Sequence, residues 1–328
     1  PSGDPDPTAS AAPIEAWEPD PENTPAPLYQ PTYYSLHFIG DCTLASVPYY
    51  QNSPEGYLKV VGDDYAYPFA KTVEYFKDDD WTFANLECVL SNGGWPADKT
   101  FLFKAPPEYA KIMSEGSVEF VSLANNHTFD YNQPGYDDTV KALEAEGIQW
   151  IGRDEWRVYE LRDGLRIGVY SEFYDHEPAV RTKMTQLAAQ DDVDFIIAAF
   201  HWGEEGSYQV SSDQQAKAHA AVDCGADFVY GSHPHTVQPI EEYKGVPIYY
   251  GMGNFVFKKG MMQGMWNYGY SISGEIKDGK ITTDIIPHFF DGERLDRFYG
   301  DEKAYFDKYM AMLNRFTADE DVSERLWN

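Results

Sequence analysis

Short apolar runs recur along the middle of the chain, and each one ends in a cluster of polar residues. The runs span residues 34–39, 120–123, 166–170, 195–200, 228–230 and 247–250. Runs of this length between turn residues are typical of strands. Because helix-like segments follow most of these runs, the alternation predicts an α/β fold.

Three segments carry both a start and a stop signal for a helix. Proline is favoured at the beginning of a helix and glycine just beyond its end, which predicts helices over residues 106–116 and 134–147. Ser211 and Gln214 have the spacing of a capping box at the start of a third helix, which Gly225 ends.

The pattern changes toward the end of the chain. Asp278-Gly279 separates the alternating segments 271–276 and 281–286, and this dipeptide is a strong signal for a β-hairpin. Residues 301–316 then predict an amphipathic helix. Its apolar residues recur at helical spacing: Tyr305, Tyr309, Met312 and Leu313.

Residues 1–31 have a different composition from the rest of the chain. They hold nine of the 21 prolines and six acidic residues, with no lysine or arginine. Such a composition favours an extended, solvated tether. We therefore expect a linker over 1–31, one α/β domain over 32–290, and a helical extension over 291–328 packed on that domain. A stalk of this kind suggests an extracellular protein tethered to the cell surface, with its signal or anchor outside the sequence given.

Charge and motif content exclude several classes of function. With 25 Lys+Arg against 54 Asp+Glu, the net charge is −29, which disfavours nucleic acid as a partner. Apolar runs are far shorter than the roughly 18 residues that cross a bilayer. The three cysteines form no CxxC pair, which disfavours a thiolate zinc site. No GxSxG, P-loop or GxGxxG motif occurs.

Polar residues that can bind metal ions follow several of the predicted strands. They lie at positions 40–41, 85–87, 125–127, 201–204 and 231–235. Ligands of open α/β sheets bind where the chain leaves the carboxyl ends of the strands. Carboxylate, amide and imidazole groups from separate strands suit two divalent cations about 3.5–4 Å apart, which favour hydrolysis. Taken singly, Asp41 also fits an ordinary turn and His201 a buried structural histidine.

Three of these segments, taken in order, carry a family resemblance. They are residues 121–127 (VSLANNH) followed by Asp130, residues 225–235 (GADFVYGSHPH), and residues 249–255 (YYGMGNF). From about Tyr34 to Phe257 the chain resembles the bacterial capsule-synthesis, or poly-γ-glutamate-synthesis, family (the CapA family), which is related to calcineurin-like metallophosphoesterases. The resemblance implies a four-layer α-β-β-α sandwich with a dinuclear metal centre.

The resemblance also implies a role for each candidate residue. The implied ligands are Asp41 and His235 on a first ion, Glu87 between two ions, and Asn126, His201 and His233 on a second. His127 is similar to the histidine that protonates the leaving group. The ions would be Mn, Fe or Zn. Thr43 stands where the phosphoesterases have a histidine, and Glu87 replaces an aspartate, so one ion could be loosely held or absent.

Three further residues are expected to contact substrate. The cation of Lys104 could bind a carboxylate or phosphate, with an ordinary surface lysine as the alternative. Trp202 and Glu204 could shape the pocket beside His201, although a tryptophan there more often packs in the core. Cys42 and Cys88 directly follow the two candidate carboxylates, and a disulfide between them is a further hypothesis.

Three functions remain open on the sequence. The first is a metal-dependent hydrolase acting on an anionic extracellular polymer or its precursor, with poly-γ-glutamate implied by the resemblance and membrane-bound capsule-synthesis machinery as a partner. The net charge of −29 opposes a polyanionic substrate, so a local cation or bridging Ca²⁺ would be needed. The others are a non-catalytic polymer-binding or anchoring protein and a phosphoesterase.

Overall fold

The computed structural model describes residues 33–51, 53–257, 268–290 and 295–297, and residues 304, 306–308, 310 and 311 near the end of the chain. The predicted linker over 1–31 lies outside these residues, as does most of the predicted extension. The domain boundaries drawn from the sequence therefore stay predictions.

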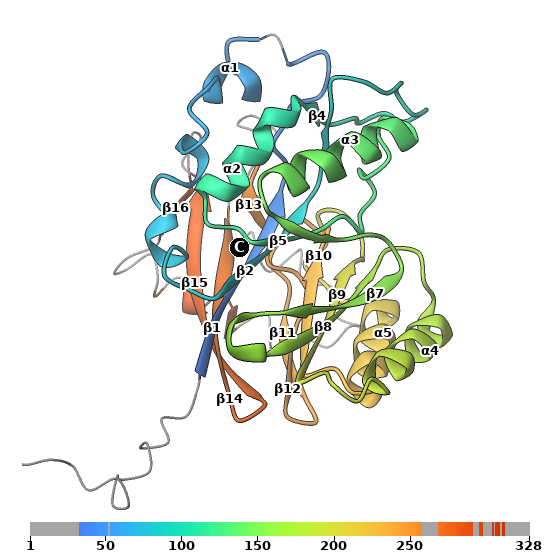
Figure 1. Ribbon diagram of the computed structural model, residues 1–328. Coiled ribbons are helices and arrows are strands. Elements are labelled where there is room, and N and C mark those ends of the chain that lie inside the picture. The colour runs from blue at the N-terminus through green and yellow to red at the C-terminus, as the bar shows by residue number, and fades with distance from the viewer. Residues whose placement is uncertain are drawn as a thin grey trace, which may run out of the picture. The chain divides into compact units, whose positions relative to one another are not determined.

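Two large sheets form the framework of the described chain (Figure 1). The first has the strand order β16-β15-β14-β1-β2-β5-β6, with β13 paired to β1. Its strands are β1 (Tyr33–Cys42), β2 (Trp81–Leu86), β5 (Phe120–Ser122), β6 (Gln149–Ile151), β13 (Asn254–Val256), β14 (Tyr268–Lys277), β15 (Lys280–Phe290) and β16 (Leu295–Arg297). Because β1, β2, β5 and β6 run parallel, their carboxyl ends lie at one edge.

The second sheet has the order β11-β12-β10-β9-β8-β7. Its strands are β7 (Glu155–Glu160), β8 (Arg166–Glu172), β9 (Phe195–His201), β10 (Phe228–Ser232), β11 (Ile240–Tyr243) and β12 (Val246–Tyr249). Here too the four central strands are parallel, and only β7 and β11 at the two edges are antiparallel. A short separate pair joins β3 (Val89–Leu90) to β4 (Lys104–Ala105).

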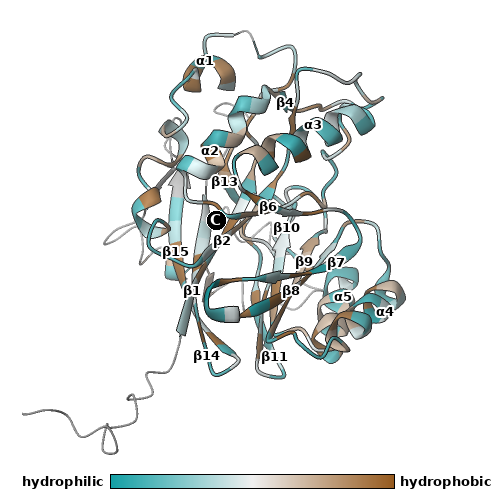
Figure 2. Ribbon diagram, viewed as in Figure 1, coloured by the Kyte–Doolittle hydropathy of each residue, from teal (hydrophilic) through white to brown (hydrophobic). Residues whose placement is uncertain are grey.

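Helices pack on the outer faces of both sheets. The helices are α1 (Tyr57–Val61), α2 (Ala110–Glu115), α3 (Asn132–Ala145), α4 (Glu177–Ala188) and α5 (Ser212–Asp223), with 3₁₀ turns η1 (Tyr67–Phe69), η2 (Val73–Tyr75), η3 (Pro107–Tyr109) and η4 (Arg162–Gly164). Buried residues of α2 and α3 share one core with β2 and β5. Those of α4 and α5 share another with β8, β9 and β10. In Figure 2 these helices carry both apolar and polar positions, as amphipathic surface helices do.

A third core lies between the two sheets. It consists of inward-facing aromatic and aliphatic residues of both, among them Phe38 of β1 and Phe228 of β10, whose rings stack at 4.2 Å. Since alternate residues of a strand face opposite sides, each buried strand contributes to this core on one face and to a helix-covered core on the other.

The predicted mixed α/β fold and the hairpin near the end of the chain are confirmed. Strands β14 and β15 pair antiparallel. Asp278 (φ 52°) and Gly279 (φ 71°) both take the positive φ that a two-residue turn requires. The predicted capping box of α5 is present, with Ser211 accepting from the backbone of Gln214.

The predicted terminal helix is described only in part. Residues 304, 306–308, 310 and 311 are helical, and Phe306 and Met310 are buried in the core between the sheets. Tyr305, Tyr309, Met312 and Leu313 lie outside the described residues. Among the helices that the structure does describe, none has the length and apolarity to span a membrane.

Candidate metal centre

The carboxyl ends of strands from both sheets meet around one group of acidic and imidazole side chains. Asp41 lies near the end of β1, and Glu87 directly follows β2. His201 ends β9, while His233 and His235 follow β10. Parallel pairing aligns these positions, because Asp41 is opposite Asn85 on β2 and His201 is opposite Ser232 on β10. Residues more than a hundred positions apart thus reach one place.

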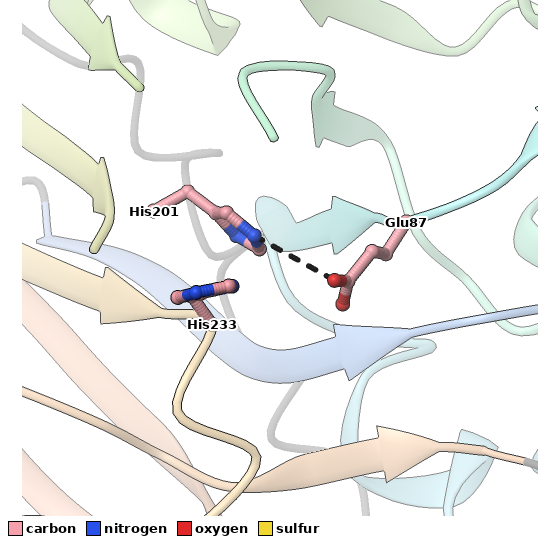
Figure 3. A group of neighbouring side chains, drawn as sticks. All are labelled: Glu87, His201 and His233. Carbon is pink, nitrogen blue, oxygen red and sulfur yellow. Dashed lines mark ion pairs between the residues drawn. The ribbon is translucent and has the colours of Figure 1, made fainter. Parts of the chain in front are cut away.

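Glu87, His201 and His233 form the first group of potential ligands. Each offers a nitrogen or oxygen atom within 4.8 Å of the others. Figure 3 shows the three side chains gathered together, with a dashed line between His201 and Glu87. His201 Nε2 lies 3.6 Å from Glu87 Oε1. Glu87 and His201 are buried, whereas His233 is half-buried. Two imidazoles and one carboxylate at this spacing are a donor set that suits Zn, Fe or Mn.

Asp41, Glu87 and His235 form a second group, and all three are buried. His235 Nδ1 lies 3.4 Å from Asp41 Oδ2, and its Nε2 lies 3.8 Å from Glu87 Oε1. The carboxylate of Glu87 therefore belongs to both groups. An acidic side chain in this position can bridge two cations.

The surroundings of Glu87 test whether a cation fits. Its side chain is 1% exposed. Neither carboxylate oxygen has a hydrogen-bond partner within the described part of the chain. Burial, followed by the nearby charge of Asp41, raises the pKa of Glu87 well above its usual range. A buried carboxylate without partners is costly. Divalent cations supply the missing compensation, so the donor set fits a metal centre.

The three histidines respond differently to this environment. Burial alone would lower the pKa of His235, but the carboxylates of Glu87 and Asp41 more than offset it and raise the pKa to about 10. His235 is therefore protonated at neutral pH, and its positive charge balances the nearby carboxylates in the way that a metal ion would. Burial and repulsion from the other imidazoles lower the pKa of His201 well below its usual range, and lower that of His233 to about 4. These two imidazoles are neutral, the form that binds metal ions.

The turn after β10 holds two residues with a strained backbone. His233 has φ 96° and His235 has φ 58°, both in the region that glycine favours. Residues other than glycine in such conformations cost roughly 1–3 kcal/mol each and cluster at functional sites. The sequence keeps two histidines where glycine would be easier, which indicates that their imidazoles are needed there.

Neighbouring polar residues orient the imidazoles. Ser232 Oγ lies 3.0 Å from His201 Nδ1 and itself donates to the carbonyl of Phe200. It therefore accepts a hydrogen bond from Nδ1, which leaves the lone pair of His201 Nε2 on the side of Glu87 and Asn126. Asn254 Oδ1 does the same for His235 Nδ1 at 2.8 Å. Such outer partners fix the tautomer and ring direction of a metal-binding histidine.

Two asparagines connect the groups further. Asn85 donates to Asp41 Oδ1 at 2.8 Å and lies 3.3 Å from His201 Nδ1, so it touches a member of each group. The predicted ligand Asn126 places its Oδ1 at 2.9 Å from His201 Nε2. Its neutral oxygen can join His201 on the same ion.

His127 lies beside this cluster in a polar chain of its own. Its Nδ1 is 2.7 Å from Asp130 Oδ2, and Asp130 Oδ1 accepts from Lys99 Nζ at 2.6 Å. Lys99 also donates to the carbonyl of Asn126. Burial lowers the pKa of His127, and the bond to Asp130 opposes that shift. With Nδ1 held by Asp130, Nε2 is the nitrogen available to a substrate.

The structure places the three predicted substrate-binding residues in different surroundings. Trp202 is buried, donates to the carbonyl of Tyr250, and stacks on Phe200 in the core under α4 and α5. Glu204 is exposed. Lys104 places Nζ over the ring of Tyr131 at 4.0 Å. Trp202 therefore packs in the core, which was the alternative interpretation of this residue.

Two other expectations concern the residues after the carboxylates. Thr43 is buried, and its Oγ1 has no hydrogen-bond partner among the described residues. Cys42 and Cys88 are both buried free thiols, so the hypothesised disulfide is not formed. The sequence reasoning missed Asn85, Lys99, Ser232 and Asn254 as supporting residues. Of these, Asn85 and Ser232 stood within strand-end segments that it singled out.

Comparison with known proteins gives one family and several relatives. The model of the family described as bacterial capsule synthesis protein PGA_cap matches residues 35–259. A capsule biosynthesis protein CapA of Bacillus anthracis is 31% identical over 228 residues, covering 61% of this chain and 55% of that protein. A PGA biosynthesis protein CapA of Bacillus subtilis (strain 168) is 25% identical over 272 residues, covering 74% of this chain and 68% of that protein.

A third relative comes from Mycobacterium tuberculosis (strain ATCC 25618 / H37Rv) and is named as a probable polyglutamine synthesis accessory protein. It is 28% identical over 228 residues, covering 59% of this chain and 60% of that protein. The chain spans just over half the length of the Bacillus anthracis relative. The match to the family model includes every residue of the candidate metal centre.

Proposed function

The chain belongs to the bacterial capsule synthesis protein family PGA_cap, and from this premise we propose that it is a metal-dependent hydrolase that processes an anionic capsule polymer outside the cell. The observation that carries the proposal is the buried carboxylate of Glu87, which lies without hydrogen-bond partners in the described chain between Asp41 and three histidines. The names of the Bacillus relatives support poly-γ-glutamate as the polymer.

The residues divide between holding cations and moving protons. Asp41, Glu87 and His235 would hold one ion, and Glu87, Asn126, His201 and His233 the other. When bound, such ions supply Lewis-acid activation of water and of the group that is attacked. Ser232 and Asn254 keep the imidazoles aimed at Glu87. His127 then protonates the leaving group through Nε2, because Asp130 holds its Nδ1.

The same proposal extends to the architecture and the surroundings of the protein. We assign the two sheets and their outer helices to the four-layer α-β-β-α sandwich of the metallophosphoesterase type, supported by the separate cores on either side of each sheet. The proline-rich acidic segment 1–31 supports a tether at the cell surface, where membrane-bound capsule-synthesis machinery would be the partner.

A non-catalytic role in binding or anchoring polymer is the second candidate. It is favoured by Thr43, a buried residue with a hydroxyl that offers a weaker ligand than the histidine of the phosphoesterases. A protein that holds polymer without hydrolysing it needs only part of the metal-binding set. A phosphoesterase is the third candidate, supported by the family relationship alone.

Hydrolysis of defined substrates separates the candidates. Purified protein loaded with Mn, Fe or Zn is incubated with γ-linked glutamate oligomers, and new amino termini are counted. We expect turnover that His127→Ala abolishes and that His219→Ala retains, since His219 lies at the surface against Glu241 and Tyr243. Binding without turnover would replace the hydrolase by the anchoring role. Turnover of phosphate diesters instead would identify a phosphoesterase.

A further inference from the structure

A second candidate site lies where the chain passes from the first sheet to the second. Between the end of β6 and the start of β7, residues 152–154 cross from one sheet to the other. A cavity of about 240 Å³ opens there, against α3. The residues that line it include Phe129, Tyr136, Arg153, Glu155 and Arg157. Two arginines thus face one small cavity of a protein with net charge −29.

Arg153 is held rigidly in a collar of aromatic rings. Its guanidinium carbon lies 4.6 Å from the ring centre of Phe129, 4.9 Å from that of Phe173 and 5.1 Å from that of Tyr174. One nitrogen donates to the carbonyl of Asn125 at 2.6 Å. Its Nε is buried without a hydrogen-bond partner in the described chain. The side chain of Tyr174 is a second hydrogen-bond partner, and since arginine has five N–H donors, these two partners leave donors for a ligand.

Arg157 is the more exposed cation of the pair. Its guanidinium lies over the ring of Trp150 at 4.4 Å and pairs with Glu155 at 2.8 Å. Glu155 also accepts from the backbone N–H of Gly152. The carboxylate of Glu155 thus accepts from both Arg157 and Gly152. It balances only one of the two arginine charges, so the residues that line the cavity carry a net positive charge. Stacking on rings holds both guanidinium groups in fixed planes, which suits oxyanions.

Short contacts connect this cavity to the candidate metal centre. The carbonyl that Arg153 binds belongs to Asn125, directly before the candidate ligand Asn126. Phe173, part of the collar, has its ring 5.7 Å from that of His201. The ring of Phe173 therefore contacts both Arg153 of the cavity and His201 of the candidate metal centre.

We propose that this cavity is a subsite in which Arg153 and Arg157 bind a carboxylate of an anionic polymer, while an adjoining segment lies at the metal centre. The second half of this statement rests on the proposed function, and the first half does not. Ligand pockets for drug-sized molecules have volumes of about 300–1,000 Å³. A cavity of about 240 Å³ instead fits one small charged unit of a chain. Its two arginines also supply the local positive charge that an anionic polymer needs in order to approach a protein of net charge −29.

Binding of a fluorescent γ-linked glutamate oligomer to the whole, metal-free chain tests the subsite. We expect Arg157→Gln to weaken binding several-fold and Arg153→Gln to weaken it on the order of tenfold or more, as loss of a charge-assisted hydrogen bond does. Arg181→Gln is the matched control. Arg181 is 44% exposed and pairs with Glu177, much as Arg157 is 40% exposed and pairs with Glu155.

Several outcomes would overturn the subsite. Binding equal to wild type in both cavity variants would do so, and so would an equal loss in Arg181→Gln, which would indicate attraction to charge anywhere. Thermal unfolding checks that Arg153→Gln folds, and Arg157→Gln decides the case if it does not. Preferential displacement of the oligomer by inorganic tripolyphosphate over glutarate would contradict the carboxylate assignment.

Metal uptake by the same samples keeps this test separate from the proposed function. Arginine-dependent binding in a protein that takes up no metal would leave the subsite standing and remove the hydrolase. Metal uptake with turnover that neither arginine variant changes would leave the hydrolase standing and remove the subsite.

Discussion

The two halves of the candidate metal centre share Glu87 but differ in charge and access. One half, Asp41 with Glu87 and His235, is wholly buried and holds two carboxylates. The other, Glu87 with His201 and His233, has two imidazoles and one half-buried member. We call them the closed half and the open half. Carboxylates favour hard cations and imidazoles favour Zn, Fe or Cu.

This difference predicts separate roles for the two ions. The closed half is suited to retaining an ion, because its charge is concentrated and solvent has little access. The open half is suited to exchange and to contact with substrate, because His233 is only half-buried. Four tests can break or sharpen the comparison.

Glu87→Gln should have the largest effect, since its carboxylate is the one shared ligand. Both halves lose it, so metal content after dialysis should fall close to zero. The loss of affinity should exceed the roughly 10–100-fold that removal of an outer partner costs. Elemental analysis gives the result. Glu241→Gln, a partly exposed glutamate paired with His219, is the control. A variant that keeps both ions would show that Glu87 does not bridge them.

Single histidine variants should separate the halves. His233→Ala should lose the ion of the open half and keep the other, because Asp41, Glu87 and His235 remain together. His235→Ala should lose the ion of the closed half. Metal-to-protein ratios after dialysis distinguish the two variants. If both lose all metal, the halves bind cooperatively and the comparison fails.

Proton release should distinguish the halves as a function of pH. In the metal-free protein the pKa of His235 is about 10, so an ion entering the closed half must displace a proton. Affinity there should rise about tenfold per pH unit from neutral pH up to the pKa of His235. In the open half neither imidazole has to lose a proton, because the pKa of His233 is about 4 and that of His201 also lies below its usual range, so a proton released there comes from Glu87 and the rise should be smaller.

Calorimetry in buffers of different ionisation enthalpy measures the released proton. The free energy of unfolding of the metal-free protein gives an independent check, because it should fall as the pH rises while the metal affinity of the closed half should rise. The proton on His235 stabilises the folded state below its unfolded pKa of 6.5, and that contribution is lost as the pH rises through about 10. Metal uptake at neutral pH without proton release would contradict the charged state of His235.

Ser232→Ala should give the smallest effect and should touch one half only. It removes the hydroxyl that accepts from Nδ1 of His201. The affinity of the open half should fall about tenfold, at the low end for an outer partner, while the closed half is unchanged. Isothermal titration resolves the two events. Ser207→Ala is a matched control, because the Ser207 hydroxyl hydrogen-bonds only to the backbone of Gln209 among the described residues. Equal weakening of both halves would argue against separate sites.

Local signals of the sequence were enough for much of the fold. The capping residues of α5 and the Asp278-Gly279 turn act over a few positions, so they could be read without tertiary contacts. Helix α3 begins at Asn132, two residues before the expected Pro134, because a turn after His127 leads into it. Helix α4 had no such paired signals and was not predicted.

The site was predictable where strand ends dictate it. Asp41, Glu87, His201 and the histidine turn lie at or just after the ends of strands, and parallel pairing brings these ends together. Trp202 was placed beside His201, but neighbouring residues of an extended chain face opposite sides, so Trp202 enters the helix-covered core.

Lys99 and Arg153 could not be anticipated in the same way. Lys99 comes from the irregular segment between β3 and β4, and Arg153 from the crossing between the sheets. Their partners, Asp130 and the carbonyl of Asn125, are fixed only by tertiary structure. Spacing along the chain carries no information about such contacts.

The most direct test of the account is a crystal of the protein grown with Mn²⁺ and measured for anomalous diffraction. The account predicts two anomalous peaks, one on each side of the Glu87 carboxylate, the first touching Asp41 and His235 and the second His201 and His233. An absence of peaks at Glu87, with manganese bound only by other residues, would contradict it.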